Sequence, residues 1–187
     1  LMDRIKPNAR GVVTQLKQMN IQAIMMTGDS EFVAKAVASD VGIEEYRAKV
    51  LPAEKMGIVK AFQERGLKVG MVGDGINDAP ALAQADAGIA LGAGTDVAKE
   101  AGDIVLIKND MMDVIRAIQL GKRTLSKIRQ NLFWAFFYNV IGIPIAAGVM
   151  YPIFGISLKP EYAGLAMAFS SVSVVTNSLL LKVRRMQ

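Results

Sequence analysis

Apolar residues follow two alternating patterns along the first 119 residues of the chain. Val12, Leu16 and Met19 repeat at the spacing of one helix face, and the apolar run 21–26 that follows them predicts a buried strand. The same patterns predict the remaining elements in alternation, namely helix 32–40, strand 47–51, helix 52–65, strand 67–72, helix 77–84, strand 87–91 and strand 103–107. Strands that alternate with helices predict an α/β fold with a parallel sheet covered on both faces.

Two long stretches without charge dominate the pattern beyond residue 119. Residues 131–158 and 162–181 contain no Lys, Arg, Asp or Glu, and each is long enough for a helix to cross a hydrocarbon core of about 30 Å. Clustered cations lie before the first stretch and after the second, at Lys122, Arg123, Lys127, Arg129, Lys182, Arg184 and Arg185. This arrangement predicts a two-helix transmembrane hairpin with both ends in the cytoplasm. Two apolar helices buried in a soluble core are the alternative.

Charge divides the chain at the same place. Residues 1–119 carry 14 Lys and Arg against 16 Asp and Glu, whereas residues 120–187 carry 8 against 1. The basic half therefore favours a membrane surface over nucleic acid as its partner. The 187 residues include neither Cys nor His, which excludes thiolate and imidazole metal ligands and a Ser-His-Asp triad from this sequence. No secretory signal is evident and the sequence begins at Leu1, so we expect a fragment of a longer protein.

Polar residues with the chemistry of a phosphate site follow two of the predicted strands. Thr27, Gly28 and Asp29 follow the predicted strand 21–26, and the sequence GDGIND at 73–78 follows the predicted strand 67–72. In parallel α/β sheets, ligands bind at the carboxyl ends of the strands. Both loops are therefore candidates for a binding site.

The candidate residues match particular parts of a phosphate in complex with a metal ion. Asp74 and Asp78 lie in one tight loop with Asn77, and carboxylate oxygens are hard ligands that suit Mg²⁺. Thr27 and Gly28 offer a hydroxyl and an unhindered N–H to a phosphate oxygen, directly before a predicted helix N-terminus. Lys55 begins another helix and could neutralise phosphoryl charge. Taken singly, these residues also fit ordinary turns and a solvated helix lysine.

Three strings in this order resemble the signatures of P-type ATPases: MMTGD at 25–29, PAEK at 52–55 and VGDGINDAPAL at 72–82. The resemblance implies a haloacid-dehalogenase-like phosphorylation domain at 1–119, with Thr27 binding phosphate and Lys55 stabilising the phosphoryl group. It also implies Mg²⁺ bound by Asp74, with Asp78, in the loop that Asn77 helps to shape. The catalytic residues implied are Thr27, Gly28, Asp29, Lys55, Asp74, Asn77 and Asp78.

The sequence departs from that family in one important respect. The family's phosphorylated aspartate lies in an Asp-Lys-Thr-Gly-Thr motif, and the 187 residues contain no such string. The nucleotide-binding domain, the actuator domain and the earlier membrane helices of the family are also missing from it. We therefore expect the C-terminal part of a pump, unable to form an aspartyl-phosphate by itself.

Polar residues within the charge-free stretches suggest the transported ion. Met167 and Ser171 are four residues apart and so share a helix face, and a thioether suits Cu(I) better than Zn²⁺. Helix packing is the alternative explanation for such residues. The last two membrane helices of the Cu(I)-exporting, heavy-metal branch are similar to this region in Asn131, Tyr138, Asn139, Pro144, Met167 and Ser171. The resemblance implies Tyr138, Asn139, Met167 and Ser171 as Cu⁺-site residues, although the branch's Cys-Pro-Cys is not in this sequence.

Together, these observations favour the C-terminal part of an ATP-driven copper(I) exporter that works through an aspartyl-phosphate. It would be a multi-pass protein of the cell membrane, with a cytoplasmic phosphorylation domain at 1–119, a final hairpin at 120–187 and a cytoplasmic C-terminus. Mg²⁺ and ATP would be needed, and the bilayer, the upstream domains and a copper chaperone would be its partners, without nucleic acid. A Zn²⁺/Cd²⁺ pump is the nearest alternative. Residues 162–181 contain no Asp or Glu, however, and so offer no carboxylate to balance a divalent ion. A soluble haloacid-dehalogenase-type phosphatase and a non-catalytic membrane anchor are further alternatives.

Overall fold

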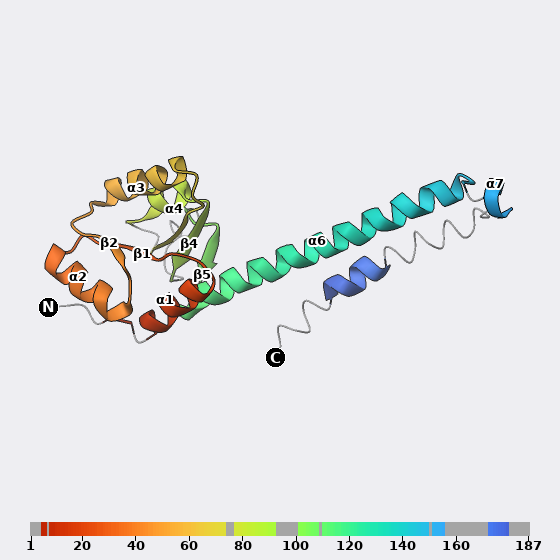
Figure 1. The fold of residues 1–187 in the computed structure, drawn as a ribbon. Helices are drawn as coiled ribbons and strands as arrows, with labels where there is room; N and C mark the ends of the chain where they lie inside the picture. The colour runs from red at the N-terminus through yellow and green to blue at the C-terminus, as the bar shows by residue number, and fades with distance from the viewer. Residues whose placement is uncertain are drawn as a thin grey trace. The chain divides into compact units, whose positions relative to one another are not determined.

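The computed structural model describes residues 5–6, 8–73, 77–92, 101–108, 110–149, 151–155 and 172–179. It divides into two compact units, Leu1–Ile118 and Gln119–Gln187. The first unit contains α1 (Ala9–Gln18), β1 (Ile24–Met26), α2 (Glu31–Val41), β2 (Glu45–Arg47), α3 (Pro52–Glu64), β3 (Gly70–Gly73), α4 (Ala79–Gln84), β4 (Ala87–Leu91) and β5 (Ile104–Leu106) (Figure 1).

Parallel strands form two small sheets in the first unit. β1 pairs with β2, which places Met25 opposite Tyr46, and β3, β4 and β5 pair in that order, which places Val72 opposite Ile89. The expected α/β class and parallel strand direction are confirmed. The expectation of one continuous sheet is not met, because within the described residues no ladder of hydrogen bonds joins β1 to β3.

Capping residues set the ends of α2, which lie within one residue of the predicted helix 32–40. The Ser30 side chain accepts a hydrogen bond from the Val33 N–H at the start of the helix, and Gly42 ends the helix in the left-handed region with φ of 83°. α4 instead begins two residues later than expected, at Ala79, with Asp78 as its N-cap. That shift keeps the Asp78 side chain at the helix start, where it can reach neighbouring elements.

The predicted strand 47–51 is wrong. β2 is Glu45–Arg47, and the chain then leaves the extended conformation, since Lys49 has a φ of 53°. The amides of Lys49 and of the next residue donate to carbonyl oxygens of the 27–29 loop at 2.9 and 3.0 Å. The apolar residues that suggested a strand therefore belong to a connection that supports another loop.

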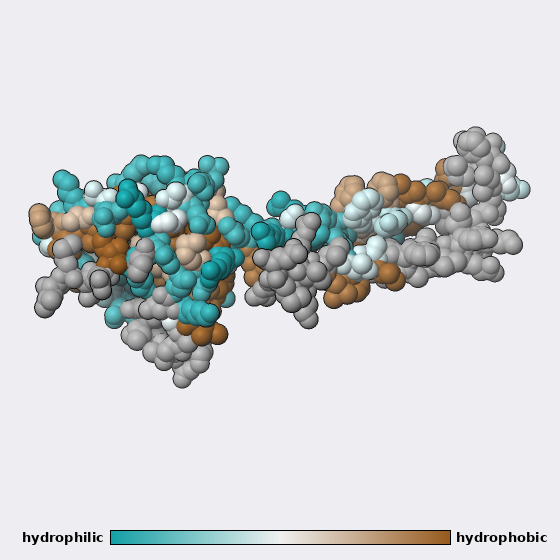
Figure 2. Space-filling view, turned by 90° about the horizontal axis from the view of Figure 1, so that it is seen from below, coloured by the Kyte–Doolittle hydropathy of each residue, from teal (hydrophilic) through white to brown (hydrophobic). Residues whose placement is uncertain are grey.

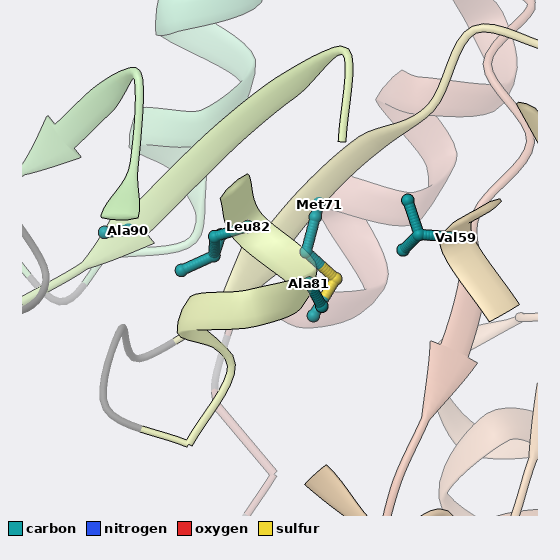
Figure 3. Close-up of a cluster of buried hydrophobic side chains, with 5 residues drawn as sticks. All are labelled: Val59, Met71, Ala81, Leu82 and Ala90. Atoms are coloured by element: carbon teal, nitrogen blue, oxygen red, sulfur yellow. The ribbon is translucent and has the colours of Figure 1, made fainter. Parts of the chain in front are cut away.

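A hydrophobic core holds α3 and α4 against the three-stranded sheet. Its buried members are Val59, Met71, Ala81, Leu82 and Ala90 (Figure 3). α4 approaches β4 so closely that a Cβ at Gly88 would lie 2.6 Å from the carbonyl oxygen of Leu82. This packing fixes the position of α4, and with it the residue that caps the helix.

One long helix dominates the second unit. α6 (Met112–Ala146) begins in the first unit, α7 is Tyr151–Phe154, and residues 172–179 form a further helical segment. Hydrophobic residues gather along the later part of α6 (Figure 2). Among the helices in the described ranges, none is both long and apolar enough to cross a membrane. The two-helix hairpin stays a prediction, and 156–171 lies outside the described residues.

Candidate active site

The loop of Thr27, Gly28 and Asp29 leaves β1 at its carboxyl end. The Thr27 hydroxyl donates to Asp29 Oδ2 at 2.7 Å and accepts from the Asp29 N–H at 3.1 Å. The Thr27 N–H also donates to the carbonyl oxygen of Arg47 at 3.0 Å, which extends the β1–β2 ladder by one residue. These bonds fix the hydroxyl just before the N-terminus of α2, whose first N–H groups lack intrahelical partners.

The connection after β2 supports this loop from its other side. The Lys49 N–H donates to the carbonyl oxygen of Asp29, and the Val50 N–H donates to that of Thr27. Sequence reasoning missed this support. The left-handed conformation of Lys49 carries no sequence signal, since glycine or asparagine normally marks such a position.

Lys55 of α3 and Asp78 at the start of α4 form a close ion pair. Lys55 Nζ donates to Asp78 Oδ1 at 2.6 Å, and the two side chains are only 15% and 11% exposed. Among the residues that the structure describes, Asp78 is the one charged residue classed as buried. Water screens such a pair weakly, so the carboxylate holds the ammonium group in place. The fold thus brings together two predicted site residues that are 23 positions apart.

Gly73, the last residue of β3, lies directly against Asp78. A Cβ at Gly73 would lie 2.7 Å from Asp78 Cβ and 2.9 Å from its Cγ. Such distances are too short for carbon atoms in a packed interior, so a larger residue would displace the carboxylate. The absence of a side chain at Gly73 therefore makes room for the ion pair.

A cavity of about 1440 Å³ lies in the first unit and is lined in part by β1 and β3. Apolar residues of both strands line it, among them Met25, Met26, Met71 and Val72. Asp29, Lys55 and Asp78 line it as well. Three of the predicted site residues therefore face one common space.

Three other predicted residues, Thr27, Gly28 and Asn77, are not among those that line this cavity. Asn77 is exposed, and Asp74 lies outside the described residues. Within the described ranges, no group of three or more acidic residues could hold a metal ion. The Mg²⁺ site therefore stays a prediction.

The predicted Cu⁺-site residues of α6 contact their own helix. Tyr138 packs beside Trp134 with ring centroids 6.0 Å apart, and Asn139 Nδ2 donates to the carbonyl oxygen of Ala135 at 2.9 Å. Met167 and Ser171 lie outside the described residues. A shared Cu⁺ site between the two predicted helices stays a prediction.

Proteins named as copper transporters match nearly the whole chain. It is 56% identical over 182 residues to the probable copper-transporting ATPase PacS of Synechocystis sp., covering 97% of this chain and 24% of that protein. It is 57% identical over 180 residues to the probable copper-exporting P-type ATPase of Archaeoglobus fulgidus, covering 96% and 22%. Copper-transporting ATPase 2 of Mus musculus is 54% identical over 185 residues, covering 99% and 13%. The chain thus spans about a quarter or less of the length of these relatives.

Family and structure comparisons agree on the fold. Residues 1–86 match the model of the haloacid dehalogenase-like hydrolases. A zinc-transporting PIB-type ATPase in its E2.Pi state aligns with a TM-score of 0.82 and 33% identity, over 96% of this chain and 28% of that one. The catalytic CPx-ATPase domain CopB-B aligns with a TM-score of 0.55 and 36% identity, over 60% and 45%. The haloacid-dehalogenase-like fold expected for the first unit is therefore confirmed.

Proposed function

We propose that this chain, which belongs to the P-type ATPases, is the C-terminal part of a copper(I) exporter. The observation that carries the proposal is the identity of 56% and 57% to proteins named copper-transporting or copper-exporting. The identity to the zinc-transporting structure is 33%. The first unit would take part in phosphoryl transfer from ATP to an aspartate and then to water, and the second would take part in moving Cu⁺.

The residues of the first unit suit charge stabilisation during that transfer. The Lys55 ammonium would offset negative charge on the phosphoryl oxygens, and Asp78 holds it in position through a contact of 2.6 Å. The Thr27 hydroxyl and the first N–H groups of α2 would donate to the same oxygens. Because phosphoryl transfer depends mainly on positioning and electrostatics, these contacts are the expected contribution of the chain.

The cavity beside β1 and β3 supports an upstream strand as the source of the phosphorylated aspartate. Both strands lie at edges of their parallel sheets, so a strand inserted between them would find backbone partners on both sides. Its carboxyl end would reach the part of the cavity lined by Asp29, Lys55 and Asp78. Such a strand would also join the two sheets into the single sheet that the element order predicts.

Mg²⁺ fits the donor chemistry of the loop between β3 and α4. Asp78 and Asp74 provide carboxylate oxygens, which are hard ligands. Since Lys55 engages Oδ1 of Asp78, Asp74 is the principal ligand in this proposal. When bound, Mg²⁺ would offset charge on the phosphoryl group.

The second unit would form the final transmembrane hairpin, with the first unit and the C-terminus on the cytoplasmic side. The alignment to the zinc-transporting structure supports this, since it covers 96% of the chain and so extends well past residue 119. Tyr138, Asn139, Met167 and Ser171 would contribute to the Cu⁺ path. The bilayer, the upstream domains and a copper chaperone would be the partners.

Two alternatives are weaker. A Zn²⁺/Cd²⁺ pump would need negative charge to balance a divalent ion, and 162–181 contains no Asp or Glu. A soluble phosphatase of the same fold would not account for the similarity of residues beyond 119 to named copper transporters. Both alternatives make different predictions for the experiments that follow.

Substitution of the loop carboxylates tests the phosphoryl-transfer role. In membranes that contain the intact protein, we expect Asp74→Asn and Asp78→Asn each to lower Cu⁺-stimulated phosphoenzyme formation at least about a hundredfold, the scale of one charge-stabilising contact. Labelling with ATP at matched protein levels measures this. The control is Asp40→Asn, an exposed residue of α2. Unchanged labelling in both loop variants would contradict the assignment.

Substitution of Met167 tests the transported ion. We expect Met167→Ala to weaken Cu⁺ binding and Cu⁺-stimulated turnover of the intact protein more than Phe169→Ala does. The thioether is a soft ligand for Cu(I), whereas residue 169 lies about 200° round a helix from residue 167. Cu⁺ stoichiometry and turnover are measured on both purified variants. Wild-type Cu⁺ binding by Met167→Ala would refute the copper assignment.

A further inference from the structure

A chain of hydrogen bonds links α6 to the helical segment 172–179 within the second unit. Lys127 Nζ donates to Asn177 Oδ1 at 2.7 Å, and Asn177 Nδ2 donates to Asn131 Oδ1 at 2.7 Å. Asn131 Nδ2 donates to Ser178 Oγ at 2.9 Å, and that hydroxyl donates to the carbonyl oxygen of Val174 at 2.8 Å. The helices it joins are 46 to 50 residues apart in sequence.

The Lys127 ammonium group fixes which way the hydrogen bonds of this series run. Lys127 can only donate, so Asn177 must turn its oxygen toward the lysine and its amide nitrogen toward Asn131. The same rule orients Asn131, whose oxygen accepts and whose nitrogen donates to Ser178. Each group then has one compatible orientation, so sliding one helix by a turn would break all the interhelical links together.

The hydrogen-bond chain lies on one face of α6. Lys127 and Asn131 are half-buried, while the residues between them are exposed, and Val174 and Asn177 are the half-buried residues of the facing segment. Tyr138 lies seven residues after Asn131, which places it about 20° away round the helix and about 10.5 Å further along. Tyr138 therefore shares the face that carries the hydrogen-bond chain.

We propose that Lys127, Asn131, Asn177 and Ser178 are positioning residues that set the register between α6 and the last helix. The proposal rests on the function proposed above, because the register decides which residues of the two helices come level. Segment 172–179 runs back along α6 (Figure 1). In the helix predicted for 162–181, Ser171 lies six residues, or about 9 Å, before Asn177. A register locked at Asn131 and Asn177 would thus bring Ser171 level with Tyr138.

The Cu⁺ dependence of the intact protein tests this role. We expect Asn177→Leu and Asn131→Leu each to raise the Cu⁺ concentration for half-maximal phosphoenzyme formation about threefold or more, the scale of one interhelical hydrogen bond. Phosphoenzyme at saturating Cu⁺ should stay unchanged, since the site in the first unit is intact. The matched control is Thr176→Val, because within the part of the chain that the structure describes the Thr176 hydroxyl donates to the carbonyl oxygen of Val172 in its own helix and to no residue of α6.

Two further variants separate positioning from general damage. The double variant Asn131→Leu/Asn177→Leu should need no more Cu⁺ for half-maximal phosphoenzyme formation than the more impaired single variant, since both residues belong to one series of hydrogen bonds. Asn177→Asp should retain wild-type Cu⁺ dependence. Its carboxylate accepts from Lys127 and from the rotated Asn131 amide, and the Ser178 hydroxyl can then donate to the Asn131 oxygen in place of Val174. Unchanged Cu⁺ dependence in the leucine variants, or additive losses, would overturn the proposal.

Cross-linking tests the register without reference to copper. In an intact protein with its other cysteines replaced, Asn131→Cys/Ser178→Cys should form a disulfide more readily than Asn131→Cys/Val174→Cys, whose second position is one turn away. Preference for the second pair would overturn the register. If cross-linking shows the register but Met167→Ala leaves Cu⁺ binding intact, the copper proposal fails. The positioning of Cu⁺-site residues then fails with it. If Met167→Ala weakens Cu⁺ binding and the leucine variants do not, only the positioning role fails.

Discussion

Removal of either partner of the Lys55–Asp78 ion pair should destabilise the first unit more than removal of both. The contact is 2.6 Å, and both side chains are almost fully covered, at 15% and 11% exposure. A single substitution, Lys55→Met or Asp78→Asn, leaves the other group without its partner in a site that water reaches poorly. The double substitution leaves no charge there.

The size of the effect follows from the geometry. At an effective dielectric constant of about 20, two unit charges at this distance attract by about 6 kcal/mol, and most of that is offset by loss of hydration. Breaking a buried pair by removing one partner costs about 3–5 kcal/mol. The residual exposure favours the lower end, so we expect each single variant to lose about 3 kcal/mol of unfolding free energy. The double variant should lose about 1 kcal/mol, because the methionine and asparagine side chains have volumes similar to those they replace and carry no charge.

Native-state hydrogen exchange of the whole chain measures these losses within the first unit. Amides of the β3–β4 ladder report its opening, and a loss of about 3 kcal/mol speeds their exchange roughly 150-fold. The control is Lys60→Met, whose pair with Glu64 on the same helix spans 4.0 Å and is 63% and 68% exposed. That variant should change the free energy by less than about 0.5 kcal/mol. Single variants as stable as the control, or a double variant with the summed loss, would refute the reasoning.

Two more predictions concern packing and pH. Gly88→Ala should lower the unfolding free energy by about 2 kcal/mol, since its Cβ would meet the Leu82 backbone at 2.6 Å. Gly57→Ala in α3, where a Cβ would meet nothing within 4 Å, should raise the unfolding free energy by about 0.5–1 kcal/mol. Thermal unfolding compares the two variants, and equal midpoints would contradict the steric argument. Hydrogen bonds from Lys68, the Val69 N–H and Gln63 hold the pKa of Asp86 far below its usual value, so its stabilisation is present above about pH 4 and is lost as pH falls below that value. Asp86→Asn should flatten the fall in unfolding free energy between pH 5 and 3 in denaturant titrations, and an unchanged slope would show that Asp86 does not carry it.

Local sequence signals were sufficient where the chain caps its own elements. Ser30 and Gly42 cap α2 within one residue of the helix predicted at 32–40, and the predicted strand 87–91 is β4 without change. The prediction failed at 47–51 because the conformation of Lys49 is set by hydrogen bonds to a loop 20 residues earlier. A contact of that kind leaves no periodic trace in the residues themselves.

The site could be predicted as a group of residues, but not as a geometry. Motif order and strand ends indicated that Thr27, Lys55 and Asp78 belong together. The pairing of Lys55 with Asp78 depends on how α3 and α4 pack against the three-stranded sheet. Gly73 and Gly88 permit this packing, since a Cβ at either position would lie under 3 Å from a neighbouring atom. Spacing along the chain does not encode those approaches, so the ion pair and its buried state emerge only from the fold.

A lysine supplies directional information in both units that apolar packing does not supply. Hydrophobic burial depends on area and tolerates sliding of one surface over another, whereas a hydrogen bond weakens steeply with angle and distance. In the first unit, Asp78 holds the Lys55 ammonium at one point of the cavity lining. In the second, Lys127 orients two asparagine amides in succession. Each arrangement favours one relative position of two helices where the apolar contacts would accept several, and the Cu⁺ site proposed for the second unit would need that selection.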